Sequence, residues 1–182
     1  MKDVTIVPFN GKTPRIHETA FVAPGCRLIG DVSIGAGSSL WYNCVLRADV
    51  NAIVIGERSN IQDGTVVHCD SGHGTRAGFP TLIGDDVLIG HMAMIHGCTL
   101  KDRAFVGLGT IVMDGCVIEG GGMLAAGAML TPGKTIAAGE MWGGRPARLM
   151  KTLTEAQQAS NGMGAVGYAI LAQAHVKAVS EG

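Results

Sequence analysis

The feature that most constrains the fold of this chain is an aliphatic residue at every sixth position. The series runs in blocks, takes one five-residue step after Ile95 and then continues unbroken: Val22, Leu28, Ile34, Leu40 and Leu46; Ile55, Ile61 and Val67; Ile83, Ile89 and Ile95; Leu100, Val106, Val112, Ile118, Leu124, Leu130 and Ile136. A helix repeats apolar residues every three or four positions and an amphipathic strand every two, so a period of six excludes both as the governing unit. It predicts a triangular parallel β-coil, in which each hexad forms one side and its turn and the aliphatic residue points inward.

The composition fits the narrow interior of such a coil. The chain has 28 glycines and only 4% aromatic residues, so small side chains dominate where a conventional core would hold large ones. Cys26 and Cys44, and likewise Cys98 and Cys116, are eighteen residues or one coil apart, and each pair is expected to stack as buried thiols. We therefore expect an all-β fold, a left-handed parallel β-helix of hexapeptide repeats, followed by a C-terminal α-helix.

The ends of the repeat divide the chain into two regions. Residues 1–140 are predicted to form the β-helix domain, with an irregular or extended N-terminal arm that contains three prolines. Residues 141–182 are predicted to form a linker and a helix, because the hexads stop and helix-starting residues precede an alanine-rich stretch. Leu171, His175 and Val179, spaced four residues apart, are expected to pack this helix on the coil, although three glycines weaken its middle.

Charge and composition exclude several classes of partner. The formal net charge of −1 gives no electrostatic reason to expect nucleic acid or an anionic membrane. No apolar run approaches the ~20 residues of a membrane helix, and the N-terminus lacks the apolar core of a secretory signal, so we expect a cytoplasmic protein. The five cysteines include no CxxC motif, which argues against a disulfide framework and against a four-thiolate zinc site.

Three of the six histidines, His68, His91 and His96, lie near the centre of the repeat. His68 and His96 each follow an inward aliphatic residue, and they fall one coil apart on the same side if residues 71–80 (SGHGTRAGFP) leave the coil as a loop. One strand spacing of ~4.8 Å then separates them, which two ligands of one metal ion can span. His91 falls one hexad before His96, on another side, so it reaches such an ion only from a neighbouring subunit of a three-fold trimer.

Three neutral imidazoles with an open fourth position are typical of a catalytic zinc ion, which supplies hydroxide near neutral pH. Iron and cobalt are alternatives. For each histidine alone a hydrogen-bonded turn residue is the simpler interpretation, but two in register and one a side away together favour a metal. The sequence therefore predicts a homotrimer with a three-histidine metal site at each interface.

Four motifs surround or include these histidines. They are VLRAD at 45–49, IGERSNIQDGTVVH at 55–68, IGH at 89–91 and IHGC at 95–98. In these motifs, and from about Ile16 to Leu153, the sequence resembles the γ-class carbonic anhydrase family of hexapeptide-repeat proteins. The resemblance implies that the three histidines are the metal ligands and that Gln62 orients the metal-bound water or hydroxide.

The resemblance also implies roles for four further residues. Arg47 and Asp49 match an interface and site pair of the family, and Asp63 matches the acid that pairs with the arginine across the interface. A structural salt bridge that assembles the trimer is the alternative for these three residues. Tyr168 on the final helix matches a tyrosine that reaches such sites.

The chain departs from the founding members of the family at two places. They carry a glutamate after the Arg-x-Asp aspartate, where this chain has Val50, and a loop glutamate that shuttles protons, where residues 71–80 include no carboxylate. Because hydration of carbon dioxide must export a proton in each turnover, these losses predict weak turnover. His73 is a candidate shuttle, although an exposed and idle side chain is the simpler interpretation.

The leading hypothesis is a carbonic anhydrase-like lyase that reversibly hydrates carbon dioxide to bicarbonate through metal-bound hydroxide. Two alternatives stay open. An acyl thioester hydrolase or acyltransferase of the same repeat superfamily would use a general-base histidine and would survive chelation of the metal. A noncatalytic, metal-stabilised trimer would act as a binding protein, and chelation would dissociate or destabilise it.

Overall fold

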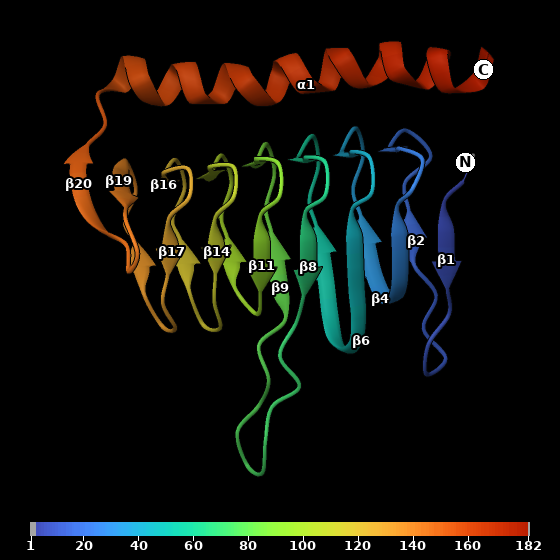
Figure 1. Ribbon diagram of the computed structural model, residues 1–182, viewed down its shortest axis with the longest axis horizontal. Helices are drawn as coiled ribbons and strands as arrows, with labels where there is room; N and C mark the ends of the chain where they lie inside the picture. Colours follow the sequence, from blue (N-terminus) through green and yellow to red (C-terminus); the bar gives the residue numbers. More distant parts are fainter. Residues whose placement is uncertain (1–2, 182) are drawn as a thin grey trace.

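The computed structural model describes residues 3–181, apart from the side chains at positions 160 and 162. Its short strands stack into the coils of a left-handed parallel β-helix, and helix α1 (Glu155–Glu181) runs back along the whole length of the stack (Figure 1). The architecture predicted from the six-residue period is therefore confirmed.

Equivalent sides of successive coils form three faces. Face 1 contains β3 (Phe21–Val22), β5 (Ser39–Leu40), β7 (Asn60–Ile61), β10 (Leu88–Ile89), β13 (Phe105–Val106), β16 (Met123–Leu124), β19 (Glu140–Gly143) and the antiparallel β20 (Arg148–Thr152). Face 2 contains β1 (Thr5–Val7), the first parts of β4 (Arg27–Ile34) and β6 (Val45–Ile55), β8 (Val66–His68), β11 (Met94–His96), β14 (Ile111–Val112) and β17 (Met129–Leu130). Face 3 contains β2 (Arg15–Ile16), the second parts of β4 and β6, β9 (Thr81–Ile83), β12 (Thr99–Leu100), β15 (Val117–Ile118) and β18 (Thr135–Ile136).

The inward aliphatic residues form one continuous core. Leu28, Leu46, Ile61 and Ile95 are fully buried, and each aligns with its counterpart in the next coil. The five cysteines are buried free thiols, and the pairing of Arg27 with Val45 places the preceding cysteines in adjacent coils as expected. Stacked side chains in this core remove apolar surface from water at about 25 cal/mol per Å².

The six-residue register is interrupted at one corner of the described coils, the corner between faces 2 and 3. Three extra residues lie between Ala48 and Ile53 of β6. Residues 71–80 leave the coil between β8 and β9 as the long loop at the lower edge of Figure 1. The step from Ile95 to Leu100 is one residue short. The first coil is irregular too, because Ile6 and Ile16 are ten residues apart whereas their partners Leu28 and Ile34 are six apart. The loop prediction is thus confirmed, and all four irregularities gather at what we call the 2–3 corner.

Helix α1 covers face 1, and its docking surface differs from the expected one. It begins with reciprocal bonds between Thr154 and Gln157, in which each backbone N–H donates to the other side chain at 3.1 and 3.2 Å. Leu171 is 46% exposed, so its predicted place at the docking surface is wrong. Residues three or four positions apart on α1, including buried Ala172 and half-buried His175, contact face 1. Small and aromatic side chains fit there against Trp41 and Phe21.

The β-structure extends beyond the predicted limits at both ends. β1 and β2 pair with β4 in parallel, so the N-terminal arm already supplies two sides of a coil. At the other end, Trp142 in β19 packs against the core one hexad after the last aliphatic residue and aligns with Leu124. Residues 140–152 therefore belong largely to the sheet. Helix α1 is not apolar enough to cross a membrane, and it is the single helix in residues 3–181.

Candidate metal centre

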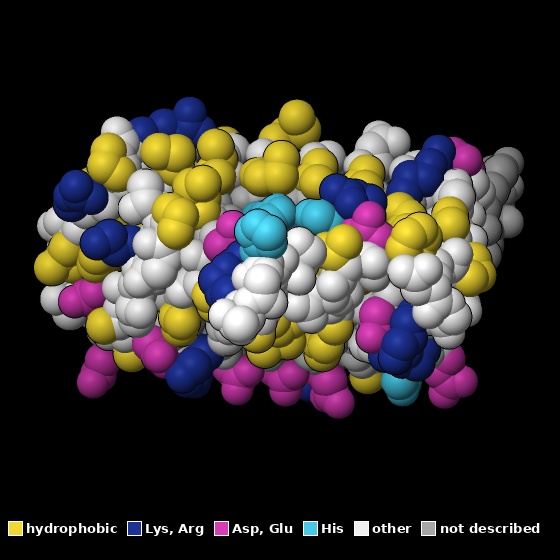
Figure 2. All heavy atoms as spheres, turned by 90° about the horizontal axis from the view of Figure 1, so that it is seen from below, with side chains coloured by type: hydrophobic (Ala, Val, Ile, Leu, Met, Phe, Trp, Pro, Cys, Tyr) yellow, Lys and Arg dark blue, Asp and Glu magenta, His cyan; other side chains and the backbone are white. Residues whose placement is uncertain are grey.

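His68 and His96 face each other at the 2–3 corner. Both end face-2 strands, and β11 pairs with β8 so that His96 aligns with His68, as the hexad register predicts. His68 Nδ1 lies 3.0 Å from His96 Nε2, and the ring centroids are 5.0 Å apart. The side chains are 16% and 35% exposed, so a ligand between the rings is accessible. Histidine side chains gather near the middle of the molecular surface in Figure 2.

A carboxylate occupies the outer nitrogen of each ring. His68 Nε2 donates to Asp49 Oδ1 at 2.9 Å, and His96 Nδ1 donates to Asp114 Oδ1 at 2.5 Å. Ionised carboxylates only accept hydrogen bonds, so in the neutral imidazoles these bonds fix the N–H on the outer nitrogens. The two inner nitrogens then present lone pairs to each other, an unfavourable contact that a cation between them relieves.

This pair of nitrogens fits a zinc ion. Ligand nitrogens ~2.0–2.1 Å from zinc in a tetrahedral site lie about 3.3 Å from each other, close to the observed separation. Carboxylates on the outer nitrogens of metal-binding histidines are the usual arrangement that orients such ligands. Among residues 3–181 no cluster of three or more His, Cys, Asp or Glu side chains could hold a metal ion. Among the described residues, the pair therefore offers a metal ion at most two nitrogen atoms from one chain.

Arg47 and Asp49 lie against this pair. Arg47 Nη1 donates to Asp49 Oδ2 at 2.5 Å, while the other oxygen of Asp49 accepts from His68. Burial alone would raise the pKa of the Asp49 carboxyl, but the hydrogen bonds from His68 and Arg47 outweigh it and hold that pKa below its ordinary value. Asp49 therefore stays ionised and keeps the His68 proton on Nε2. Val50, where the family's founding members have glutamate, is 47% exposed in the same insertion.

His91 lies at a different corner, between faces 1 and 2, where it follows β10. Its Nδ1 donates to Asp63 Oδ2 at 2.8 Å, and its side chain is 46% exposed. The neighbouring Met92 is 71% exposed and has a left-handed backbone with φ of 57°, which is strained for a side chain of this size. Asp63 thus contacts a histidine of its own chain, and its pairing with Arg47 across an interface stays a prediction.

Gln62 and Tyr168 lie on the helix-covered side. Gln62 is buried, and its Nε2 donates to Asn60 Oδ1 at 3.1 Å. Tyr168 packs edge-on against Trp41 with ring centroids 5.3 Å apart. Burial, with a smaller contribution from the charge of Asp63, raises the pKa of Tyr168 above its ordinary value. The described structure therefore accounts for Tyr168 as a docking residue of α1.

The loop of residues 71–80 is fixed against the 2–3 corner beside His96. Gly97 has a φ of 51°, and a methyl group added to it would meet Asp114 Oδ1 and would lie 3.2 Å from Phe79 Cβ and 3.3 Å from Asp70 Cβ. Asp70 accepts from Arg76 Nη1 at 2.7 Å, and the Arg76 guanidinium lies 5.5 Å from the Phe79 ring centroid. Gly97 is therefore the point at which the loop, the end of β11 and Asp114 meet.

Two features of this corner were not predicted from the sequence. Asp114 follows His96 by eighteen residues, so the coil length itself identifies it as the residue one turn further along. Phe79 shows no comparable signal, because its contact with Gly97 depends on the path of the loop. The predicted shuttle candidate His73 is exposed near the loop tip.

The sequence is similar to proteins named carbonic anhydrases, and the fold is similar to that of a hexapeptide transferase family protein. No family model matches the chain. It is 47% identical over 171 residues to gamma carbonic anhydrase 1, mitochondrial, from Arabidopsis thaliana, covering 94% of this chain but only 62% of that protein. It is 46% identical over 158 residues to a protein named "Probable carbonic anhydrase" from Methanocaldococcus jannaschii, covering 87% of this chain and 96% of that protein. The crystal structure of a hexapeptide transferase family protein from Anaplasma phagocytophilum matches with a TM-score of 0.87 and 45% identity, covering 96% of this chain and 99% of the other.

Proposed function

The chain belongs to the γ-class carbonic anhydrase family, and from this premise we propose that it catalyses the reversible hydration of carbon dioxide to bicarbonate. The observation that carries the proposal is the pair of inner nitrogens of His68 and His96, 3.0 Å apart, each ring held by a carboxylate on its outer nitrogen. No other pair of histidines in the described chain has this arrangement.

We propose zinc as the metal, with iron and cobalt as alternatives, held by His68 and His96 of one subunit and His91 of the next. When bound, such an ion lowers the pKa of a coordinated water toward neutrality and so supplies the nucleophile. Asp49, Asp114 and Asp63 each accept the N–H of one of these rings and so keep the opposite nitrogen free to bind.

We propose a homotrimer because the histidines lie at two different corners of the coil. His91 forms no three-ligand cluster with the His68 and His96 pair of its own chain, and the exposed Met92 beside it is suited to burial against a neighbouring subunit. In that assembly Gln62, next to the His91 side of the site, is proposed to orient the attacking water, and Arg47 is proposed to pair with Asp63 across the interface.

The proposed turnover is weak because the chain lacks the acids that would carry protons away. The loop of residues 71–80 offers Arg76 and the exposed His73 where a carboxylate is expected, and Arg76 is already bound by Asp70. Proton transfer to bulk solvent or buffer then limits the rate. Added imidazole buffer is accordingly expected to accelerate turnover.

Stopped-flow hydration of carbon dioxide by the zinc-loaded protein tests the activity. His96→Ala is expected to lose both zinc and hydration, whereas the control His17→Ala removes an exposed histidine in the first coil of the stack and is expected to keep both. The proposal fails if the loaded protein does not exceed the buffer rate or if His96→Ala retains it.

Mixed trimers test the split of ligands between subunits. His91→Ala and His96→Ala trimers are each expected to bind no zinc at the site. After unfolding and refolding an equal mixture, about one quarter of the interfaces combine an intact His68 and His96 pair with an intact His91, so about one quarter of the zinc should return. A site built within one chain would show no such recovery.

A transferase is the second candidate, because the structure from Anaplasma phagocytophilum is described as a hexapeptide transferase family protein. Acyl transfer or thioester hydrolysis by a general-base histidine would persist after chelation of the metal. Retained acyl transfer in the presence of a chelator, together with absent hydration, would favour it.

We propose the cytoplasm as the location of the protein. The name of the plant relative states a mitochondrial location for that protein. Fractionation of the source cells with antibody detection decides between the two compartments.

A further inference from the structure

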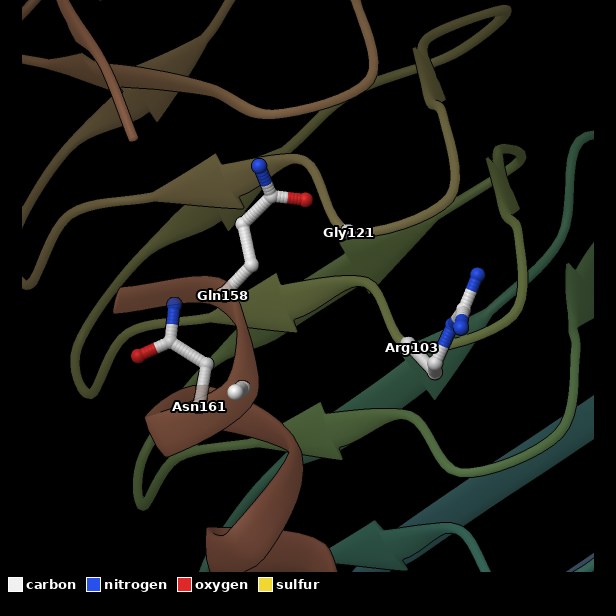
Figure 3. A pocket seen from close by; sticks show the side chains of 5 residues that line it. Arg103, Gly121, Gln158 and Asn161 are labelled. Carbon is white, nitrogen blue, oxygen red and sulfur yellow. The ribbon is translucent and has the colours of Figure 1, made fainter. Parts of the chain in front are cut away.

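A cavity of about 310 Å³ lies at the corner between faces 3 and 1, beneath the first turns of α1. Its lining comprises Arg103, Gly121, Gln158, Ala159 and Asn161. Figure 3 shows the Arg103 side chain on one side of Gly121 and the Gln158 and Asn161 side chains on the other. None of the three proposed metal ligands borders this cavity, which has the size of a small-molecule site at the lower end of the usual range.

Arg103 occupies a backbone position that favours glycine. It follows the inward Leu100 by three residues and has a φ of 61°. In other coils the same left-handed position is occupied by Gly37, Gly121 and Gly139, with φ values of 66°, 70° and 70°, and by Arg58 and Asp86, with φ values of 53° and 55°. An arginine in this left-handed conformation is strained, and such strain is concentrated at functional sites.

Arg58 shows what an arginine at this position does when its role is structural. Its φ is 53°, and its guanidinium donates to Asp86 at 2.8 and 2.9 Å and to Glu57 at 2.8 Å. Arg103, by contrast, has no acidic partner within 4 Å among residues 3–181. The adjacent Asp102 is directed to the preceding coil, where its Oδ1 accepts the backbone N–H of Asp85 at 2.9 Å. Ion pairs therefore account for the presence of an arginine at position 58, whereas no ion pair accounts for the arginine at position 103.

The other polar groups of the cavity complement a bound anion. Asn161 Nδ2 lies 3.6 Å from Met123 Sδ, a weak acceptor that a carboxylate oxygen readily replaces. Gln158 Nε2 donates to Leu153 O at 3.3 Å, which fixes this side chain across Gly121 and Gly139. None of the described residues that line the cavity is acidic. The exposed Arg103 and the half-buried Asn161 thus line one small space from opposite sides of Gly121.

We propose that this cavity binds a carboxylate, with the guanidinium of Arg103 as its main contact. The planar fork of a guanidinium matches the two oxygens of a carboxylate or of bicarbonate, and Ala159 leaves room for a short apolar group. The site is separate from the histidine pair and goes beyond the proposed hydration. It takes either bicarbonate, the product of that reaction, or a small organic carboxylate.

Titration of ¹⁵N-labelled protein with sodium bicarbonate, sodium acetate or sodium butyrate tests the site, with sodium chloride at equal ionic strength as the reference. The side-chain amide signals of Asn161 and Gln158 report binding, and Asn161→Ala identifies the first of them. The titrations are repeated in His96→Ala, so that binding at the proposed metal site does not contribute and failure of the hydratase proposal leaves the test intact.

Arg103→Gly is the decisive variant, because glycine is the residue that this backbone position favours and the variant is expected to fold. It should weaken binding at least about tenfold through loss of a charge-assisted pair. Arg58→Gly, the matched change in another coil, should leave binding unaltered.

Saturable shifts with bicarbonate alone identify the reaction product as the ligand, and tighter binding of acetate or butyrate identifies an organic carboxylate. Shifts no larger than those with chloride, or binding that survives Arg103→Gly in a folded protein, overturn the proposal.

Discussion

Gly97→Ala is expected to separate the stability of the coil from the geometry of its metal site. Gly97 has a φ of 51°, so a methyl group there adds the cost of a left-handed alanine, about 1–2 kcal/mol. The same methyl group meets Asp114 Oδ1, the far end of a side chain that can rotate away. The carboxylate then leaves His96 Nδ1, and the ring loses the bond that orients it.

Gly133→Ala provides the matched control at the same corner. Gly133 has a φ of 69°, and an added methyl group meets nothing within 4 Å. Both variants are expected to lose about 1–2 kcal/mol in the free energy of unfolding, measured by urea denaturation without metal at one protomer concentration. Because Phe79 and Asp70 also crowd position 97, Gly97→Ala is expected to lose up to about 1 kcal/mol more.

The zinc affinities of the two variants should differ far more than their stabilities. Loss of the carboxylate that orients a histidine ligand weakens metal binding by roughly 10–100-fold. Competition with a chromophoric chelator should therefore show this loss in Gly97→Ala and wild-type affinity in Gly133→Ala. Equal affinities in the two variants would show that Asp114 does not position His96 for metal binding.

Four further outcomes are expected. Asp114→Asn keeps the side-chain shape but removes the charge that holds His96, so chelator competition should show about tenfold weaker zinc binding at nearly unchanged unfolding free energy. Met92→Gly relieves the strained φ of 57° but deletes an exposed apolar side chain, so sedimentation should show weaker trimers, and unchanged association would contradict the proposed interface. Tyr168 has a raised pKa when folded, so its contribution to stability is full below about pH 10 and falls as the pH rises further; Tyr168→Phe should lose less stability than wild type in alkaline melts. Burial also protects all five thiols, so Ellman's reagent should detect them in denaturant but not in the native protein.

The fold was predictable because one local period determines both burial and pairing. An aliphatic residue at each sixth position fixes which side chain points inward, and the next coil aligns its own with it, as Leu28 and Leu46 do. The predicted β-helix ended too early, before Trp142, because the inward position of that coil is occupied by an aromatic residue, whereas the series that predicts the fold consists of aliphatic residues. It placed Leu171 wrongly because the docking of α1 depends on small residues such as Ala172, whose low hydrophobicity gives little periodic signal.

The site was predictable only where the period reaches it. When the ten loop residues are left out, His68 and His96 are eighteen residues or one coil apart, which predicts that they lie side by side. The aligned residues and the facing nitrogens agree with this prediction. Asp114 was missed because a lone aspartate in a turn usually serves the turn itself. The contacts of Phe79 with Gly97 depend on a loop path that no repeat encodes.

The 2–3 corner concentrates every change of coil length in the described part of the stack: four extra residues between β1 and β2, an insertion in β6, the ten-residue loop and the short step after Ile95. The other two corners keep a constant length, so strands beyond an insertion return to the same alignment. Sequence can therefore be added or removed at this corner without disturbing the coils above and below. For protein engineering, it is the natural graft point: loops of foreign length can be exchanged beside the histidines while the scaffold keeps its register.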